Sequence, residues 1–172
     1  MTEQPAHFDH RIGKPIADST RGAWDGITWE RATISASQLL AGMVLRPDDT
    51  VHAVWHTPMP GTTAQPWRVH ARTMGKVTRQ FGARERVDVL LPNVSLYAAR
   101  RIANVDRSGM TLYSNATLHA AWTTFCDYAD PIDLHNGSRI FGEMVRRQRA
   151  TNAFAGYRSV VDEARQTIAL DR

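Results

Sequence analysis

Residues 50–57 read TVHAVWHT, and residues 67–73 read WRVHART. In both stretches apolar and polar side chains alternate with a period of two, which is typical of β-strands that bury one face. Alternation in the first stretch places Val51, Ala53 and Trp55 on the inner face, so we expect Trp55 to be a core residue. In the second stretch the inner face carries Trp67, Val69 and Ala71, and the outer face carries Arg68, His70 and Arg72.

Further short strands are expected on either side of these two. Residues 33–35 include the β-branched Thr33 and Ile34, and residues 86–91, RVDVLL, alternate until Pro92 ends them. Arg46-Pro47-Asp48-Asp49 and Pro58-Met59-Pro60-Gly61 are strong turn sequences. Several short strands separated by such turns indicate a small central β-barrel or sandwich.

Residues 93–122 fit two arrangements. Asn93 could cap a helix with apolar residues at helical spacing, or residues 100–114 could form a hairpin that turns at Ser108-Gly109. We expect a short helix or extended piece followed by the hairpin. Asn115 is expected to cap a second short helix that runs through Trp122 to Cys126, and the helical spacing of Trp122 and Phe125 predicts that both are core residues.

Residues 127–172 have the pattern of a helical pair. Ser138 is a candidate N-cap for the first helix, and apolar residues recur after it at helical spacing. A second helix is expected over Tyr157–Leu170. A basic cluster near the end of the first helix complements the helix dipole or lies along a phosphate backbone; its members are Arg146, Arg147 and Arg149.

Residues 1–31 are predicted to form an extended N-terminal arm, because glycine and proline interrupt them and no periodicity persists. Trp24 and Trp29 are expected to dock on this domain or on a neighbouring subunit, since a solvated tail has no use for large apolar rings. The sequence therefore predicts an α+β protein in three parts: the arm, a β-rich core at residues 32–122, and a C-terminal helical hairpin at residues 123–172 packed on the core.

Positive charge is concentrated in the middle of the chain. The net charge is +4, and arginine outnumbers lysine by 19 to two, which is typical of a high-GC genome such as that of an actinobacterium or its phage. Residues 51–126 carry nine cations against three anions, whereas residues 1–50 have a net charge of −2 and residues 127–172 a net charge of zero. This asymmetry favours a polyanionic partner.

The basic run between residues 68 and 86 is the strongest candidate site. Arginine binds phosphate well, and an aromatic ring among the cations could stack on a base. A solvated strand face or a contact with an acidic protein would explain the run as well. The predicted nucleic-acid-binding residues are Arg68, Arg72, Lys76, Arg79, Phe81, Arg84 and Arg86.

No catalytic or metal-binding constellation is recognisable. His52 and His56 share a strand face but lie roughly 13 Å apart, too far to bind one ion. Cys126 stands next to Asp127, which should raise the pKa of the thiol, and we expect it to be a small core residue. The phosphate-binding, dinucleotide-binding and hydrolase motifs are absent. We therefore expect no enzyme, no metal and no cofactor.

Two functions are compatible with these patterns. The first is a non-catalytic basic binding protein associated with nucleic acid through an arginine-rich β ridge. The alternative is a structural or assembly protein, such as a capsid or tail component of a phage virion, whose arm docks on neighbouring subunits in a homo-oligomer. The sequence has no apolar run of membrane-spanning length, no secretory signal and no small-molecule motif. We expect a cytoplasmic protein, or a virion protein if it comes from a phage.

Overall fold

The computed structural model describes residues 8–9, 14–15, 25–45, 49–58, 67–127 and 130–151. No helix within these residues is long and apolar enough to cross a membrane. The elements in chain order are β1 (Phe8–Asp9), β2 (Lys14–Pro15), β3 (Ile27–Ser35), the 3-10 helix η2 (Ala36–Gln38), β4 (Val44–Leu45), β5 (Asp49–Pro58), β6 (Trp67–Thr73), β7 (Thr78–Gly82), β8 (Arg86–Val94), α1 (Leu96–Asn104), α2 (Arg107–Met110), α3 (Asn115–Cys126) and α4 (Pro131–Thr151). The sequence-based helix over residues 157–170 and Trp24 lie outside the described residues.

The strands β3 to β8 form one antiparallel sheet in the order β3-β8-β4-β5-β6-β7. Its first strand, β3, begins within the segment assigned to the arm and carries Trp29, which pairs with Pro92 of β8. The α+β class is therefore confirmed, but the expected small barrel or sandwich is wrong, because β3 to β8 form a single sheet that is not closed into a barrel. Closure requires the two outermost strands to pair, and here β3 and β7 remain at opposite edges of the sheet.

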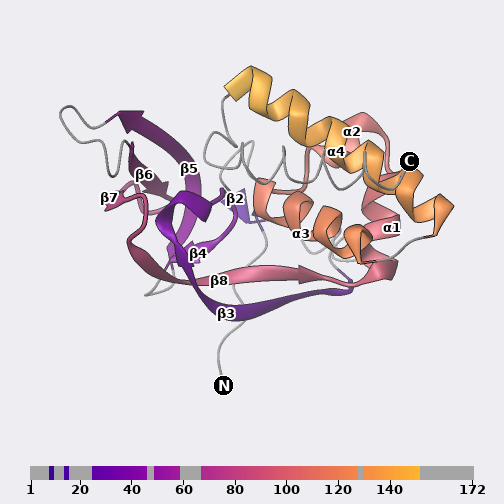
Figure 1. The fold of residues 1–172 in the computed structure, drawn as a ribbon, viewed down its shortest axis with the longest axis horizontal. Coiled ribbons are helices and arrows are strands. Elements are labelled where there is room, and N and C mark those ends of the chain that lie inside the picture. The colour runs from indigo at the N-terminus through magenta and orange to yellow at the C-terminus, as the bar shows by residue number, and fades with distance from the viewer. Residues whose placement is uncertain are drawn as a thin grey trace.

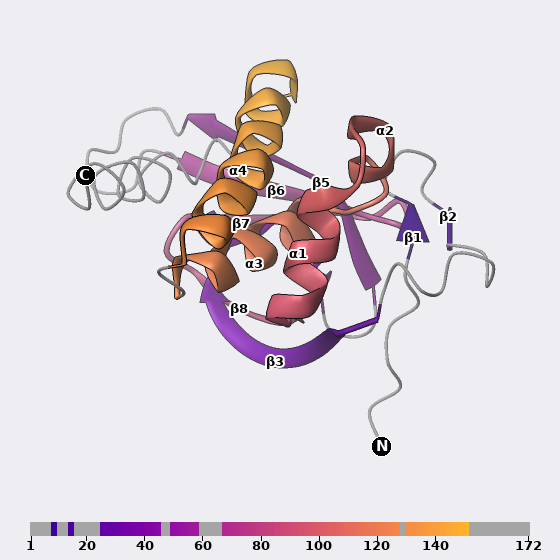
Figure 2. The same cartoon turned by 90° about the vertical axis from the view of Figure 1, so that its right-hand side faces the viewer.

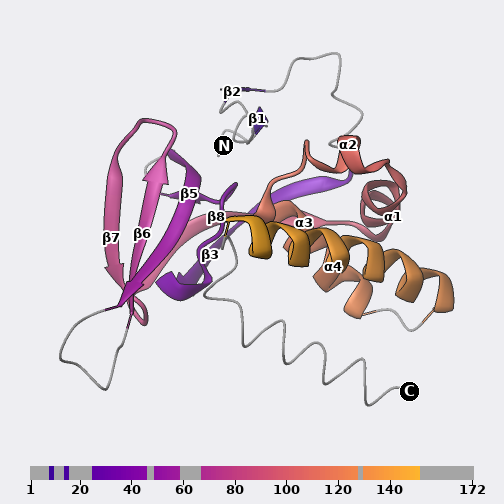
Figure 3. The ribbon, with the colours of Figure 1, turned by 90° about the horizontal axis from the view of Figure 1, so that it is seen from above.

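The helices cover only one part of this sheet. The long, curved β3–β8 pair runs beneath α1, α3 and α4 (Figures 1 and 2), while β5, β6 and β7 stand to one side of the helices (Figure 3). Strand β8 is buried on both faces, with Val87 and Val89 on one and Leu90 and Val94 on the other. In the three-stranded meander β5–β7, the side chains of Val51, Val69 and Ala71 are buried on the face turned to the core. No described helix covers the opposite face.

The short helix expected after residue 93 is present as α1, but residues 100–110 belong to α1 and α2 and the link between them, and the expected hairpin is wrong. The Ser95 side chain caps α1 by accepting a hydrogen bond from the Ala98 N–H at 3.1 Å, so the cap is not Asn93, which still belongs to β8. The expected turn at residues 108–109 is the first turn of α2, where the Gly109 N–H donates to Asp106 Oδ1 at 2.6 Å. Burial of a helical apolar face, which includes Ile102, outweighs the turn propensity of Ser-Gly.

Helix α4 begins at Pro131, about two turns before the expected cap at Ser138. Asp130 Oδ1 accepts a hydrogen bond from the Ile132 N–H at 2.8 Å, and proline is favoured in the first turn of a helix. Gly137 therefore lies inside the helix, where it allows close packing against Phe125 of α3.

Two expectations about side chains in α3 have different outcomes. Trp122 and Phe125 are buried in the core, as predicted from their helical spacing. Cys126, in contrast, is exposed, so the prediction of a core cysteine is wrong. Thr123, three residues earlier, is exposed as well, so Cys126 lies on the solvent-facing side of α3. Partial burial, followed by the charge of Asp127, raises the pKa of its thiol.

Candidate functional site

A β-bulge at His52 determines which face of β5 carries Trp55. The register of β5 on β6 passes from Val51↔Thr73 to Ala53↔Arg72, so two steps on β5 match one step on β6. The extra residue moves the following side chains to the opposite face. Val51 is fully buried, whereas Trp55 is 39% exposed, so the prediction of a core Trp55 is wrong.

Trp55 forms a stacked pair with His70, its direct neighbour on β6. The two rings are nearly parallel, with their centroids 5.2 Å apart and their planes at 4°. The Thr57 hydroxyl is hydrogen-bonded to His70 Nε2 at 2.7 Å, which holds the imidazole in this orientation. A rigid aromatic platform therefore lies on the face of the meander that points away from the core.

Arg68 and Arg72 flank this platform. Both lie two residues from His70 on β6, so the period of the strand places all three on one face, and both arginines are exposed. Arg68 Nη1 donates to Gln80 Oε1 of β7 at 3.1 Å, which restricts the guanidinium. The four-residue spacing separates the two arginines by roughly 13 Å along the strand. The outer face, as we call this surface, consists of Trp55, Thr57, Arg68, His70, Arg72 and Gln80.

The other predicted residues of the basic run do not lie on the outer face. Arg79 and Phe81 pair with Ala71 and Val69, so they lie on the opposite face, where Phe81 packs against the core. Lys76 is at the tip of the β6–β7 turn with a positive φ of 63°.

The last two members of the run lie at the other end of β7. Arg84 is exposed in the β7–β8 turn. Arg86 Nη2 donates to the Thr33 carbonyl at 2.7 Å, so this arginine ties the start of β8 to β3. Of the seven predicted residues, the structure brings together only Arg68 and Arg72 around a stacking platform.

Sequence reasoning missed the aromatic half of this site. The alternation of residues 67–73 already placed His70 beside the two arginines. Trp55 was assigned to the wrong face because a β-bulge leaves no periodic signal in the strand that contains it. The side chain of Trp67, also assigned to the core, lies outside the described part of the chain.

The electrostatics of the meander favour an anionic ligand. Residues 50–84 contain no aspartate or glutamate and five cations. The carboxylates at its two ends are engaged in turns, where the Gly75 N–H donates to Asp49 at 3.2 Å and the Gly82 N–H donates to Glu85 at 3.0 Å. Because no carboxylate stands between residues 50 and 84, the charge of Arg68 and Arg72 remains available for a ligand.

His56 and His70 lie on opposite faces of the meander. Within the residues that the structure describes, no group of three or more metal-ligating side chains is found. His56 pairs with Val69 and so lies on the inner side of β5, where burial, followed by the nearby His70, lowers its pKa.

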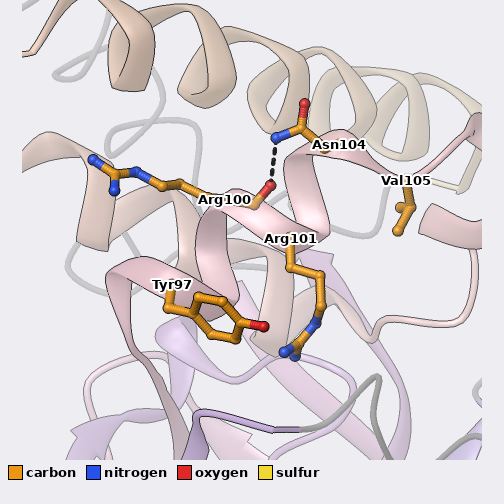
Figure 4. Close-up of a pocket in the computed structure, with 5 residues that line it drawn as sticks. All are labelled: Tyr97, Arg100, Arg101, Asn104 and Val105. Carbon is orange, nitrogen blue, oxygen red and sulfur yellow. Dashed lines mark hydrogen bonds between the residues drawn. The ribbon is translucent and has the colours of Figure 1, made fainter.

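Two described arginines of the helices, Arg100 and Arg147, form internal contacts. Arg100 makes a bidentate ion pair with the buried Asp133 of α4, at 2.8 and 2.9 Å. Arg147 is buried and donates to carbonyl oxygens of the chain between α2 and α3. A shallow, open hollow beside α1 is lined by Tyr97, Arg100, Arg101, Asn104 and Val105 (Figure 4).

Comparison with protein-family models, with curated proteins and with solved structures finds no match to this chain.

Proposed function

We propose that this protein binds nucleic acid without catalysing a reaction, through the outer face of the β5–β7 meander. The observation that carries the proposal is the exposed Trp55–His70 stack between Arg68 and Arg72. Guanidinium groups bind phosphates, and every base offers a ring face on which an aromatic side chain can stack. A sheet face that combines both is suited to a ligand with alternating phosphates and planar rings.

The remaining cations of the basic run have a supporting role in this proposal. Lys76 at the turn tip is close enough in sequence to extend the phosphate contacts beyond Arg72. Arg79, Arg84 and Arg86 lie elsewhere and contribute to the long-range attraction of a polyanion rather than to direct contacts.

A salt-dependent binding titration tests the proposal. Labelled oligonucleotides are titrated with the protein by fluorescence anisotropy at several salt concentrations. Affinity should fall log-linearly with salt because each neutralised phosphate releases counterions. The double variant Arg68→Ala/Arg72→Ala should bind more weakly, and its salt slope should be smaller by about 1.4, because each phosphate of a single strand that a cation neutralises adds about 0.7 to the slope.

The matched control is the double variant Arg79→Ala/Arg84→Ala, which removes the same charge from the same segment. It should keep the salt slope of the parent within a few tenths and lose less affinity than the outer-face variant. Equal effects of both variants, or no binding by the parent at low salt, would refute the proposal.

A second candidate function is assembly with other protein subunits, and it rests on a different surface. Tyr97 and Ile132 are 71% and 69% exposed and lie on α1 and α4, the two helices joined by the Arg100–Asp133 ion pair. Large exposed apolar side chains on neighbouring elements are typical of protein interaction surfaces.

Light scattering over a range of protein concentrations tests this candidate. The parent should form a discrete oligomer, and Tyr97→Ser/Ile132→Ser should shift it to the monomer. Val77→Ser is the control, since Val77 is 53% exposed but lies in the β6–β7 turn. A parent that stays monomeric at every concentration would exclude self-assembly through this end of the molecule.

A further inference from the structure

We infer that the outer face selects single-stranded nucleic acid over duplex, with an unpaired base stacked on the free ring face of Trp55. This inference rests on the proposed function and names its ligand class. It follows from the position of Trp55 in the sheet.

One face of the Trp55 ring is covered and the other is open. His70 stacks on the side toward β6. On the other side of β5, the short strand β4 pairs only with Asp49 and Thr50, and no described strand lies beside residues 53–58. The ring face turned away from His70 is therefore accessible, and a base placed there would extend the His70–Trp55 stack.

Duplex cannot use this platform without distortion. In a duplex both faces of each base are occupied by its neighbours, so a protein ring can enter only by unstacking a step, which costs free energy. An unpaired base has a ring face available and stacks on an aromatic side chain whatever its identity. The platform therefore adds affinity for unpaired strands that duplex does not gain.

The arginines place a backbone next to this base. Arg68 and Arg72 lie on either side of His70, roughly 13 Å apart, and residues 50–84 of the meander contain no aspartate or glutamate. A strand that runs along β6 can direct phosphates toward both guanidinium groups while one base lies at Trp55. The hydrogen bonds of Thr57 and Gln80 hold the platform and Arg68 in place before the ligand arrives.

The test compares one labelled oligonucleotide sequence as a single strand and as a duplex with its complement, in DNA and in RNA, at the same salt concentration. The parent should bind the single strand at least tenfold more tightly than the duplex. Trp55→Ala should lower single-strand affinity by about 5- to 140-fold, the fold-change of about 1–3 kcal/mol for one stacked base, and leave duplex affinity nearly unchanged. Trp55→Phe should retain most of the single-strand affinity.

Val77→Ala is the matched control, because it removes an exposed apolar side chain from the same meander, at the β6–β7 turn and away from the outer face. It should bind both ligands as the parent does. Far-UV circular dichroism and a thermal melt establish that each variant is folded.

The outcomes distinguish the inference from the function on which it rests. Binding to neither oligonucleotide overturns the proposed function itself. Equal affinity for single strand and duplex, or a Trp55→Ala variant that keeps the preference, overturns the inference and leaves nucleic-acid binding intact. Polyglutamate that competes as well as the single strand would mean that charge alone is recognised, and this too would overturn the inference.

Discussion

Replacing Arg147 by methionine should destabilise the fold strongly, although the side chain lies far from the outer face. Its guanidinium is buried and donates to the carbonyls of Tyr113 and Met110, at 2.8 and 3.1 Å, and to Asn115 Oδ1 at 2.9 Å. It also donates to Glu143 Oε1 at 3.0 Å. One side chain of α4 thus donates hydrogen bonds to the backbone carbonyl oxygens where the chain passes from α2 to α3.

The magnitude follows from what the substitution leaves behind. Methionine keeps the apolar stem of the side chain but has no hydrogen-bond donors. Each buried acceptor that is left without a hydrogen bond lowers the free energy of unfolding by about 1–3 kcal/mol. Partial relaxation makes these costs less than additive, and removal of one partner from a buried ion pair typically costs about 3–5 kcal/mol. We expect a loss in this second range, equivalent to a fall in Tm of roughly 6–20 °C for a chain of this size.

Arg146→Met is the matched control, because Arg146 pairs with the same carboxylate but has a side chain that is 41% exposed. Burial tends to raise the pKa of Glu143, but the hydrogen bonds from Arg146 and Arg147 outweigh it, so its pKa is lowered. With Arg147 present, Glu143 remains paired, and the control should cost only about 0–1 kcal/mol.

Urea denaturation followed by far-UV circular dichroism measures both variants, with equal m-values required for the comparison. If Arg147→Met lies within about 1 kcal/mol of the parent, or if Arg146→Met costs as much, the reasoning that buried acceptors decide the energetics is wrong.

Two further predictions concern stability. The hydrogen bonds of Arg100 lower the pKa of Asp133. Their contribution to the free energy of unfolding is therefore present above the unfolded-state pKa and is lost as pH falls through the folded-state pKa. Urea midpoints measured between pH 3 and 7 should fall more steeply with acid in the parent than in Asp133→Asn. Gly42 has a φ of +98°, and an added Cβ would collide with the Ser114 side chain, so Gly42→Ala should lose several °C in Tm, whereas Gly142→Ala, where the new methyl meets no atom within 4 Å, should not.

Local patterns were sufficient to predict the strands β5 and β6, the first part of β8 and the burial of Trp122 and Phe125. These features depend on periodicity within one element, and a sequence displays that directly. Strand β8 runs on through Pro92 to Val94, beyond its predicted end. A short helix was one of the two forms expected for the segment that contains α1, but α2 was missed because Ser-Gly has turn propensity in isolation. The choice between helix and hairpin depends on which side chains can be buried against the core. Helix α4 begins earlier than expected because Asp130, rather than the expected Ser138, accepts the hydrogen bond that caps its N-terminus.

The binding surface was predictable only in part. Alternation alone brought Arg68, His70 and Arg72 to one outward face. It could not reveal that Arg79 and Phe81 lie on the opposite face, because that depends on the register of β7 against β6. Nor could it place Trp55, because the bulge at His52 is defined by the partner strand.

The amino-acid sequence by itself determined the α+β class, the position of the central strands and the concentration of positive charge between residues 51 and 126, because these follow from local periodicity and composition. Only the tertiary structure decided that the sheet stays open, that Trp55 stacks on His70 and that Arg147 is buried beneath α2. Each of these depends on contacts between residues distant in the chain, where pairing register and the satisfaction of buried polar groups outweigh local preference.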